Sequence, residues 1–350
     1  MRLTDIPARV IIIAATLIVL FTTAAIAFEI EDRRVYQATP EQSRIKVIST
    51  ADLDVFDPIL RAFQATRPGV TIDYTVTGTT DLMGALYDEG AVFDLAISSA
   101  MDLQTKLAND GFAQEYAPPS TVELPSWANW RDQLFAFTQE PAVLLVSDAF
   151  FKPGEAPESR DALIALLRDN PERFEGKIGT YDVRRSGFGY LMATQDSRNS
   201  DAFWRLMEVM GRLDAKLYCC SGDMIRDVAS GKLALAYNVL GSYAASQLTS
   251  TGGFQIIEMS DYVNVMSRTA LIPQSAENVE DAGAMLDFLL GLKDRSDLVA
   301  TSGLPAIDAD TLRANPSLRP IRYGPGLLVF LDNLKRQSFL KNWENSLLQN

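Results

Sequence analysis

The chain has 350 residues, with 32 lysines and arginines against 45 aspartates and glutamates, and its formal net charge at pH 7 is −13. A surface this acidic repels phosphate backbones, so nucleic acid is excluded as an expected partner. Histidine is absent, which excludes Ser-His-Asp and Cys-His nucleophile systems and imidazole-ligated zinc or copper.

Residues 1–27 have the layout of a secretory signal peptide. Arg2 and Arg9 precede an apolar run from Val10 to Leu20, and Ala25-Ile26-Ala27 offers a peptidase site before Phe28. An uncleaved membrane anchor is the alternative, but the apolar run is shorter than the roughly 20 residues of a spanning helix. We therefore expect cleavage after Ala27 and a soluble, exported chain.

The next part of the chain alternates predicted strands with predicted helices. Apolar runs predict strands at 45–49, 70–76 and 93–97, and residues 55–63 have helical spacing. Each strand runs into a short loop that opens a helix: Thr50-Ala51-Asp52, Thr77-Gly78-Thr79-Thr80-Asp81, and Ser98-Ser99-Ala100. Such joins gather backbone N–H groups and positive helix ends, which suits a carboxylate, phosphate or phosphonate. Ordinary helix capping is the alternative for any single loop.

A second block with the same alternation of strands and helices begins after the segment 135–141. Strands are predicted at 142–146, 177–181 and 233–237, and the loop 182–189 opens a helix beside Arg184 and Arg185. The segment 262–272 is strand-like but is interrupted by Arg268, and helices are predicted at 279–292 and 327–348.

Extended segments near 135–145 and 260–272 join these two α/β blocks, which predicts two lobes and two chain crossings at a hinge. We place residues 28–138 and 268–350 in lobe 1 and residues 139–267 in lobe 2. A solute would bind in the cleft between the lobes.

Two segments, 94–104 and 229–243, resemble the extracellular solute-binding proteins of bacterial ABC transporters with the type II periplasmic binding protein fold. The similarity is to the branch that binds ferric iron, phosphonates or phosphoglycerate. It implies a monomer in the periplasm that is not an enzyme, has no cofactor or metal and delivers a small-molecule solute to an ABC permease in the inner membrane. Two alternatives stay open: a ligand sensor for a histidine kinase and a ferric-iron binder.

The resemblance also implies a set of ligand-binding residues, from the loops described above and from two helix starts of the second block. They are Thr50, Ala51, Asp52, Thr79, Thr80, Ser98, Ser99, Ser186, Gly187, Phe188, Tyr237, Gly241, Ser242 and Tyr243. Ferric binders carry two adjacent tyrosines in the last loop, whereas this chain has Gly241-Ser242 there. That departure disfavours iron and favours an anionic organic solute, such as a phosphonate, a phospho-organic acid or a carboxylate.

Three arginines are candidates for binding the anion. Arg184, Arg185 and Arg268 can each form fork-like hydrogen bonds to an oxyanion, although Arg184 and Arg185 have solvated loop charges as the alternative. Arg268 is the stronger candidate, because an arginine within an apolar strand needs a partner. Aromatic residues near the same loops could stack on an organic group: Phe137, Tyr181, Phe188, Tyr237, Tyr243 and Tyr262.

The two cysteines of the chain, Cys219 and Cys220, are adjacent. Neighbouring Cα atoms lie about 3.8 Å apart, closer than ordinary disulfides prefer. The pair is therefore a strained vicinal disulfide, a soft-metal site, or two small buried hydrophobes. A secreted carboxylate-pair hydrolase is disfavoured, because no spaced acidic pair stands out in a cleft-forming loop.

Overall fold

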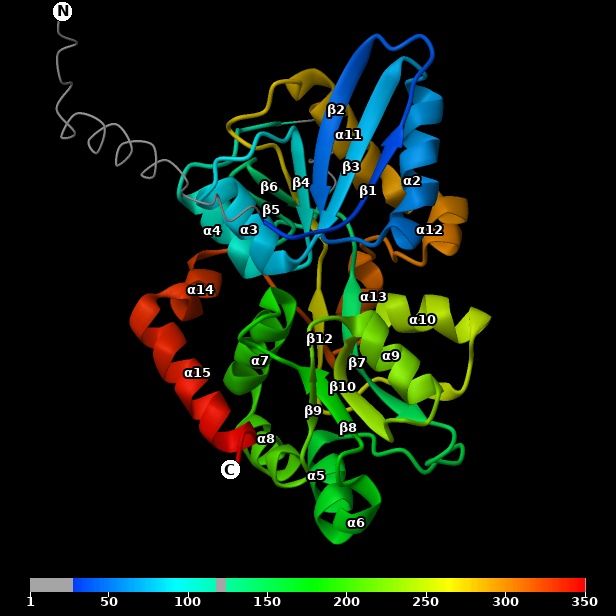
Figure 1. Ribbon diagram of the computed structural model, residues 1–350, viewed down its shortest axis with the longest axis vertical. Helices are drawn as coiled ribbons and strands as arrows, with labels where there is room; N and C mark the ends of the chain where they lie inside the picture. Colours follow the sequence, from blue (N-terminus) through cyan, green and yellow to red (C-terminus); the bar gives the residue numbers. More distant parts are fainter. Residues whose placement is uncertain (1–27, 118–123, 350) are drawn as a thin grey trace, which may run out of the picture.

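A computed structural model describes residues 28–117 and 124–349; the predicted signal peptide lies outside them. The chain forms two α/β lobes, one above the other in Figure 1, each built around its own sheet and hydrophobic core. No helix within the described residues is long and apolar enough to cross a membrane.

Lobe 1 contains a mixed sheet with the strand order β1-β3-β2-β4-β13-β6-β5. Its strands are β1 (Ile30–Tyr36), β2 (Ser43–Ser49), β3 (Val70–Thr77), β4 (Leu95–Ser98), β5 (Asn129–Trp130), β6 (Leu134–Ala136) and β13 (Thr269–Leu271). Its helices are α2 (Leu53–Thr66), α3 (Thr79–Tyr87), α4 (Met101–Asn109), α11 (Val279–Leu290), η2 (Gly291–Asp294) and α12 (Ser296–Ser302). The parallel strands β3, β2 and β4 end at the edge that faces lobe 2.

The polar segment after residue 28 forms the edge strand β1, which pairs antiparallel with β3. Arg33 anchors it by two hydrogen bonds to Asp73, from Nε at 2.8 Å and from Nη2 at 2.5 Å, and Tyr36 enters the core. This strand therefore places Glu31, its second residue, and Glu29, just before it, beside the carboxyl end of β3.

Lobe 2 has the strand order β14-β12-β7-β10-β8-β9, with β11 also paired to β7. The strands are β7 (Glu140–Ser147), β8 (Ile178–Tyr181), β9 (Lys216–Tyr218), β10 (Leu235–Leu240), β11 (Phe254–Ile257), β12 (Val263–Met266) and β14 (Leu318–Pro320). The helices are α5 (Arg160–Asp169), α6 (Pro171–Phe174), α7 (Gly187–Asn199), α8 (Ala202–Arg212), α9 (Ser221–Ala229) and α10 (Gly241–Ser250).

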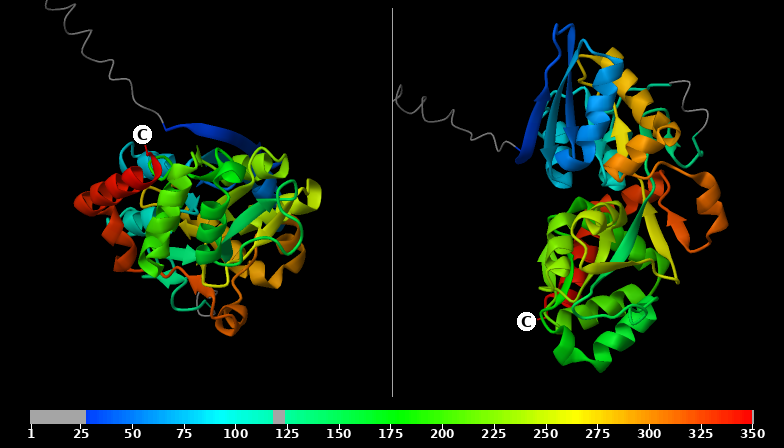
Figure 2. Two further views of the ribbon diagram at one scale, coloured as in Figure 1. Left: turned by 90° about the horizontal axis from the view of Figure 1, so that it is seen from below. Right: turned by 90° about the vertical axis from the view of Figure 1, so that its right-hand side faces the viewer.

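The chain crosses between the lobes at the two predicted places, along β7 and from β12 to β13, where Arg268 lies between the two strands. A third passage leads from α12 through α13 (Ala309–Ala314) to β14, which pairs with β12. Figure 2 shows these connections gathered on one side of the molecule.

The end of the chain differs from the predicted boundaries, which assigned all of 268–350 to lobe 1. After β14, α14 (Pro325–Leu328) and η3 (Val329–Leu331) lead into α15 (Asn333–Leu347), and α15 packs on α8 of lobe 2. Phe339, Trp343 and Leu347 are buried in the core of that lobe. The helical periodicity of this segment was evident in the sequence, but which lobe it covers depends on a contact with a distant helix.

Candidate functional site

A cavity of about 520 Å³ lies between the lobes and is lined by both of them. Lobe 1 contributes the loops that follow β2, β3 and β4 and the start of β1, and lobe 2 contributes the starts of α7, α9 and α10. The volume is in the range that holds a small organic molecule. Its position is that predicted for the ligand cleft.

Five helices begin at this cavity. The residues that precede their first turns all line it: Asp52, Gly78, Ser186, Cys220 and Leu240, before α2, α3, α7, α9 and α10. Only the Ser186 side chain caps its helix, by accepting a hydrogen bond from the Gly189 N–H at 3.1 Å; none of the other four residues provides a side-chain cap. Positive helix ends and uncapped N–H groups thus face one space, which favours negative charge there.

Arg268 is fully buried and also lines the cavity. Its Nε and Nη2 donate to the two carboxylate oxygens of Glu140 at 3.3 and 3.4 Å, whereas Nη1 has no hydrogen-bond partner among the described residues. Burial, the largest single effect, lowers the pKa of Arg268, but Glu140 together with Tyr243 and Tyr74 more than offsets it, so the pKa is raised. A buried N–H donor without a partner costs free energy.

The other two arginines of the cavity differ from Arg268 because both are exposed. Arg184 forms a bidentate pair with Asp182, at 2.8 Å from Nε and 2.7 Å from Nη2. The Arg185 side chain forms no ion pair within the described chain. Arg185 is therefore better placed than Arg184 to bind an anion that reaches this rim.

Four carboxylates also line the cavity: Glu29, Glu31, Asp52 and Asp81. None of them forms an ion pair within residues 28–117 and 124–349, and they lie close enough to repel one another. Partial burial, followed by the charges of Asp52, Asp81 and Glu29, raises the pKa of Glu31. Partial burial also raises the pKa of Asp52, although the charge of Arg268 opposes this increase. Asp81 belongs to the first turn of α3, a usual place for an acid, but helix capping does not explain Glu31 on β1 or Glu29 just before it.

The lobes touch across the mouth of the cavity, so the structure shows a closed arrangement. The Gly187 N–H donates to Thr79 Oγ1 at 2.9 Å, Thr80 Oγ1 donates to the Arg185 carbonyl at 3.3 Å, and the Asp52 N–H donates to the Tyr243 hydroxyl at 3.2 Å. A Cβ on Gly187 would come within 2.8 Å of Thr79 Oγ1, so the absence of a side chain permits this approach.

The structure brings together most of the residues that the sequence singled out. Those that line the cavity are Thr50, Asp52, Thr79, Thr80, Ser99, Arg184, Arg185, Ser186, Phe188, Tyr243 and Arg268. Those that do not line it are Ala51, Ser98, Gly187, Tyr237, Gly241 and Ser242. Gly187 contacts the opposite lobe, and the Ser242 hydroxyl bonds to the buried Glu140 carboxylate.

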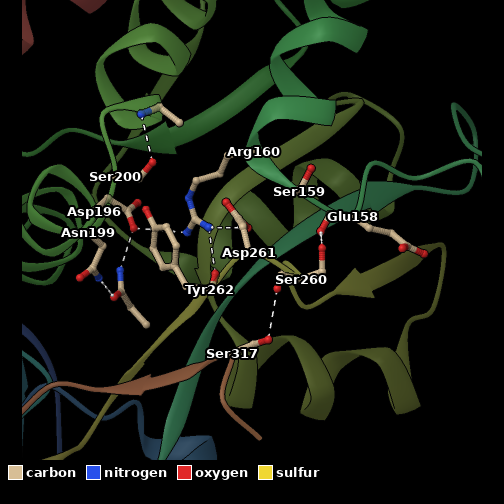
Figure 3. Close-up of polar contacts among 12 residues, drawn as sticks. Glu158, Ser159, Arg160, Asp196, Asn199, Ser200, Ser260, Asp261, Tyr262 and Ser317 are labelled. Carbon is tan, nitrogen blue, oxygen red and sulfur yellow. Dashed lines mark hydrogen bonds and ion pairs between the residues drawn. The ribbon is translucent and has the colours of Figure 1, made fainter.

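Tyr237 belongs to a buried polar network in lobe 2 instead of the cavity. Its hydroxyl accepts a hydrogen bond from Arg160 Nε at 2.6 Å and donates to Asp196 Oδ2 at 2.8 Å. Figure 3 shows the Arg160 guanidinium beside Tyr262 and Asp261, and Arg160 Nη2 lies 3.3 Å from Asp196 Oδ1. Asp196 also accepts from the side chains of Asn238 and Asn264, at 2.7 Å each. This network fixes α5 and α7 to β10 and β12, so the role of Tyr237 is structural.

Several lining residues were missed by sequence reasoning or were given no assignment. Glu29 and Glu31 lay in a charged stretch without periodicity, and their place depends on the pairing of β1 with β3. Cys219 and Cys220 are both exposed and line the cavity, so they are not buried hydrophobes. Of the six aromatic residues near the predicted loops, Tyr181, Phe188 and Tyr243 line the cavity.

Two lobes with a cavity between them, lined by both, are the architecture of a solute-binding protein. The chain belongs to the bacterial extracellular solute-binding protein family, whose model matches residues 45–297. Members of this family act outside the cytoplasm, and the substrate-binding proteins of ABC transporters deliver small solutes to permeases. A search of the curated proteins finds no match.

Solved structures agree with this assignment. The substrate-binding protein of an ABC transporter from Agrobacterium tumefaciens is 32% identical, with a TM-score of 0.85 over 90% of this chain and 98% of that one. The fold is also shared with AfuA from Actinobacillus pleuropneumoniae, solved with fructose-6-phosphate, at 12% identity, a TM-score of 0.72 and coverage of 89% and 100%. Iron-bound HitA from Pseudomonas aeruginosa matches at 14% identity, with a TM-score of 0.66 and coverage of 87% and 99%.

Proposed function

We propose that this protein captures a small organic solute with an oxyanion group, such as a phosphonate, a phosphate ester or a carboxylate, and delivers it to an ABC permease. The observation that carries the proposal is the unpartnered Nη1 of the fully buried Arg268 in the cavity wall. The starts of five helices add positive potential at the same place. One buried charge-assisted hydrogen bond is worth about 1.5 to 3 kcal/mol.

The carboxylates on the lobe 1 side refine the solute class. Glu29, Glu31 and Asp81 face the cavity without a cationic partner among the described residues, and the pKa of Glu31 is raised first by its partial burial and then by the charges of Asp52, Asp81 and Glu29. A positive group on the solute would relieve the repulsion among these carboxylates. The cavity thus has complementary positions for both ends of a small amino-substituted acid, with the acid group at Arg268 and the ammonium group at Glu31.

A melting screen with three matched compounds tests this function. We expect 2-aminoethylphosphonate to raise the unfolding midpoint more than ethylphosphonate, and ethylamine to have the smallest effect. A ligand at 1,000 times its dissociation constant adds about 4 kcal/mol of stability, which is easily detected. If Glu31→Gln abolishes the advantage of the amino compound but leaves ethylphosphonate binding unchanged, the amine position is established. The absence of stabilisation by any oxyanion would contradict the proposal.

Two alternatives are tested in parallel. Ferric iron belongs in the same screen; a midpoint raised by Fe(III) but by no organic anion would favour an iron binder. A signalling role requires the same cavity, so it is tested in the cell, by deleting the gene and comparing solute uptake with the output of a partner histidine kinase. Normal uptake together with lost kinase output would favour the sensor.

A further inference from the structure

Cys219 and Cys220 have no role in the function proposed so far. They are the only cysteines in the sequence, they are adjacent, both are exposed, and both line the solute cavity. Cys220 directly precedes α9, and the next residue, Ser221, is joined to Tyr181 of the cavity wall by a hydrogen bond of 2.5 Å between their hydroxyl oxygens. The two thiols therefore lie within the wall that a bound solute would face.

We infer that Cys219 and Cys220 form a vicinal disulfide in the exported protein and that this disulfide is part of the solute-binding wall. The inference rests on export, as the proposed function does, because disulfides persist in oxidising compartments. Each cysteine has only the other as a partner within the chain. Their Cα atoms are held at about 3.8 Å, below the usual range for a disulfide, so the bond is strained and more easily reduced than most.

The bond forms by ordinary thiol–disulfide exchange with a disulfide oxidant. The thiolate of one cysteine attacks a sulfur of the oxidant and releases the first oxidant thiol, and the thiolate of the other cysteine then attacks the mixed disulfide and releases the second. The protein loses two protons and two electrons, and the oxidant disulfide takes them up and becomes two thiols. The Cys220 thiol is exposed at its surface, but its partial desolvation, the Cys219 thiol and the charges of Glu31 and Asp223 raise its pKa.

Oxidation of the two cysteines changes the hydrogen-bonding groups that this part of the cavity wall presents to a solute. Two thiols can donate weak hydrogen bonds, whereas a disulfide has no donor and forms a compact, polarisable surface. The charge of Glu31 acts on Cys220, so these thiols and the carboxylates belong to the same part of the cavity. In the oxidised protein the carboxylates receive no hydrogen bond from the thiols and are available to a positive group of the solute. The disulfide between adjacent cysteines also closes a small ring, which fixes the backbone just before α9.

Intact mass after alkylation tests the bond directly. Protein is purified from the periplasm without reductant, denatured and treated with N-ethylmaleimide, which alkylates free thiols. It should carry no label and be lighter than the reduced chain by two hydrogen atoms. After reduction with tris(carboxyethyl)phosphine, two thiols should be labelled. Two labels on the unreduced protein would overturn the inference. This readout needs no ligand, so it is independent of whether the proposed solute class is correct.

Calorimetry with 2-aminoethylphosphonate as the probe tests the role in binding. We expect the reduced protein and a Cys219→Ser/Cys220→Ser variant to bind about tenfold more weakly than the oxidised protein, the effect of about one hydrogen bond. Equal affinities for all three would show that the disulfide has no role in recognition. If the probe binds to none of them while the mass loss is present, the proposed function fails for this solute class and the disulfide stands.

Discussion

The backbone N–H of Gly187 in lobe 2 donates a hydrogen bond to Oγ1 of Thr79 in lobe 1, at 2.9 Å. The contact joins the starts of α7 and α3, which both open onto the solute cavity. The two lobes therefore contact each other at a pair of helix starts that also line the site. A substitution that separates these helix starts should weaken solute binding without disturbing the core of either lobe.

Gly187→Ala should hold the lobes apart. The added Cβ would lie 2.8 Å from Thr79 Oγ1 and 2.9 Å from Leu103 Cδ1, both in the opposite lobe. We expect solute affinity to fall about tenfold or more and small-angle scattering to show a larger radius of gyration at saturating solute. Gly84→Ala is the matched control, because the nearest atom to its new Cβ is 3.9 Å away. Unchanged affinity in Gly187→Ala would show that closure does not require this contact.

Arg268 should be tested together with Glu140, because both are buried and each neutralises the other. Removing Arg268 alone leaves a buried carboxylate without its cation, which costs about 3 to 5 kcal/mol of stability. The double variant Arg268→Gln/Glu140→Gln should keep more of the fold and still lose binding of ethylphosphonate. Urea unfolding reports the stability and calorimetry the binding. If the double variant binds like the unmodified protein, Arg268 does not contact the solute.

Tyr237 and Tyr243 should respond differently to the loss of the phenolic hydroxyl. Tyr237→Phe removes a buried partner of Arg160 and Asp196 and should cost about 1 to 3 kcal/mol of unfolding free energy, with solute affinity retained. Tyr243→Phe removes the acceptor of the Asp52 N–H across the cleft and should lower affinity with a smaller effect on stability. The reverse pattern in denaturation and calorimetry would assign Tyr237 to the site.

Asp102 should make stability depend on pH. Burial raises the pKa of this carboxyl from 3.8 to about 7, despite the opposing hydrogen bond from the Leu103 N–H. Between these values the folded protein holds a proton that the unfolded chain has released, so this group's contribution to stability is lost as the pH rises through the window. Asp102→Asn should remove this pH-dependent loss of stability. The unfolding free energy of the variant, relative to that of the unmodified protein, should therefore increase from pH 4 to pH 8 by roughly a few kcal/mol. A constant difference in urea unfolding across this range would show that Asp102 does not titrate there.

The sequence by itself determined the two-lobed α/β organisation and the loops that face the cleft. Hydrophobic periodicity and the strand–loop–helix joins are local properties, so the starts of α3 at Thr79 and of α7 at Gly187 could be predicted from neighbouring residues. For the same reason, most residues of those loops line the cavity.

Only the tertiary structure decided where those residues lie whose positions depend on partners distant in the sequence. Tyr237 follows the same pattern as the loop residues, but Arg160 and Asp196 hold its hydroxyl inside lobe 2. Pairing of β1 with β3 brings Glu31 to the cavity, and packing on α8 assigns α15 to lobe 2. A side chain's local pattern fixes the element that carries it, whereas burial and charge pairing are settled between elements far apart in the chain.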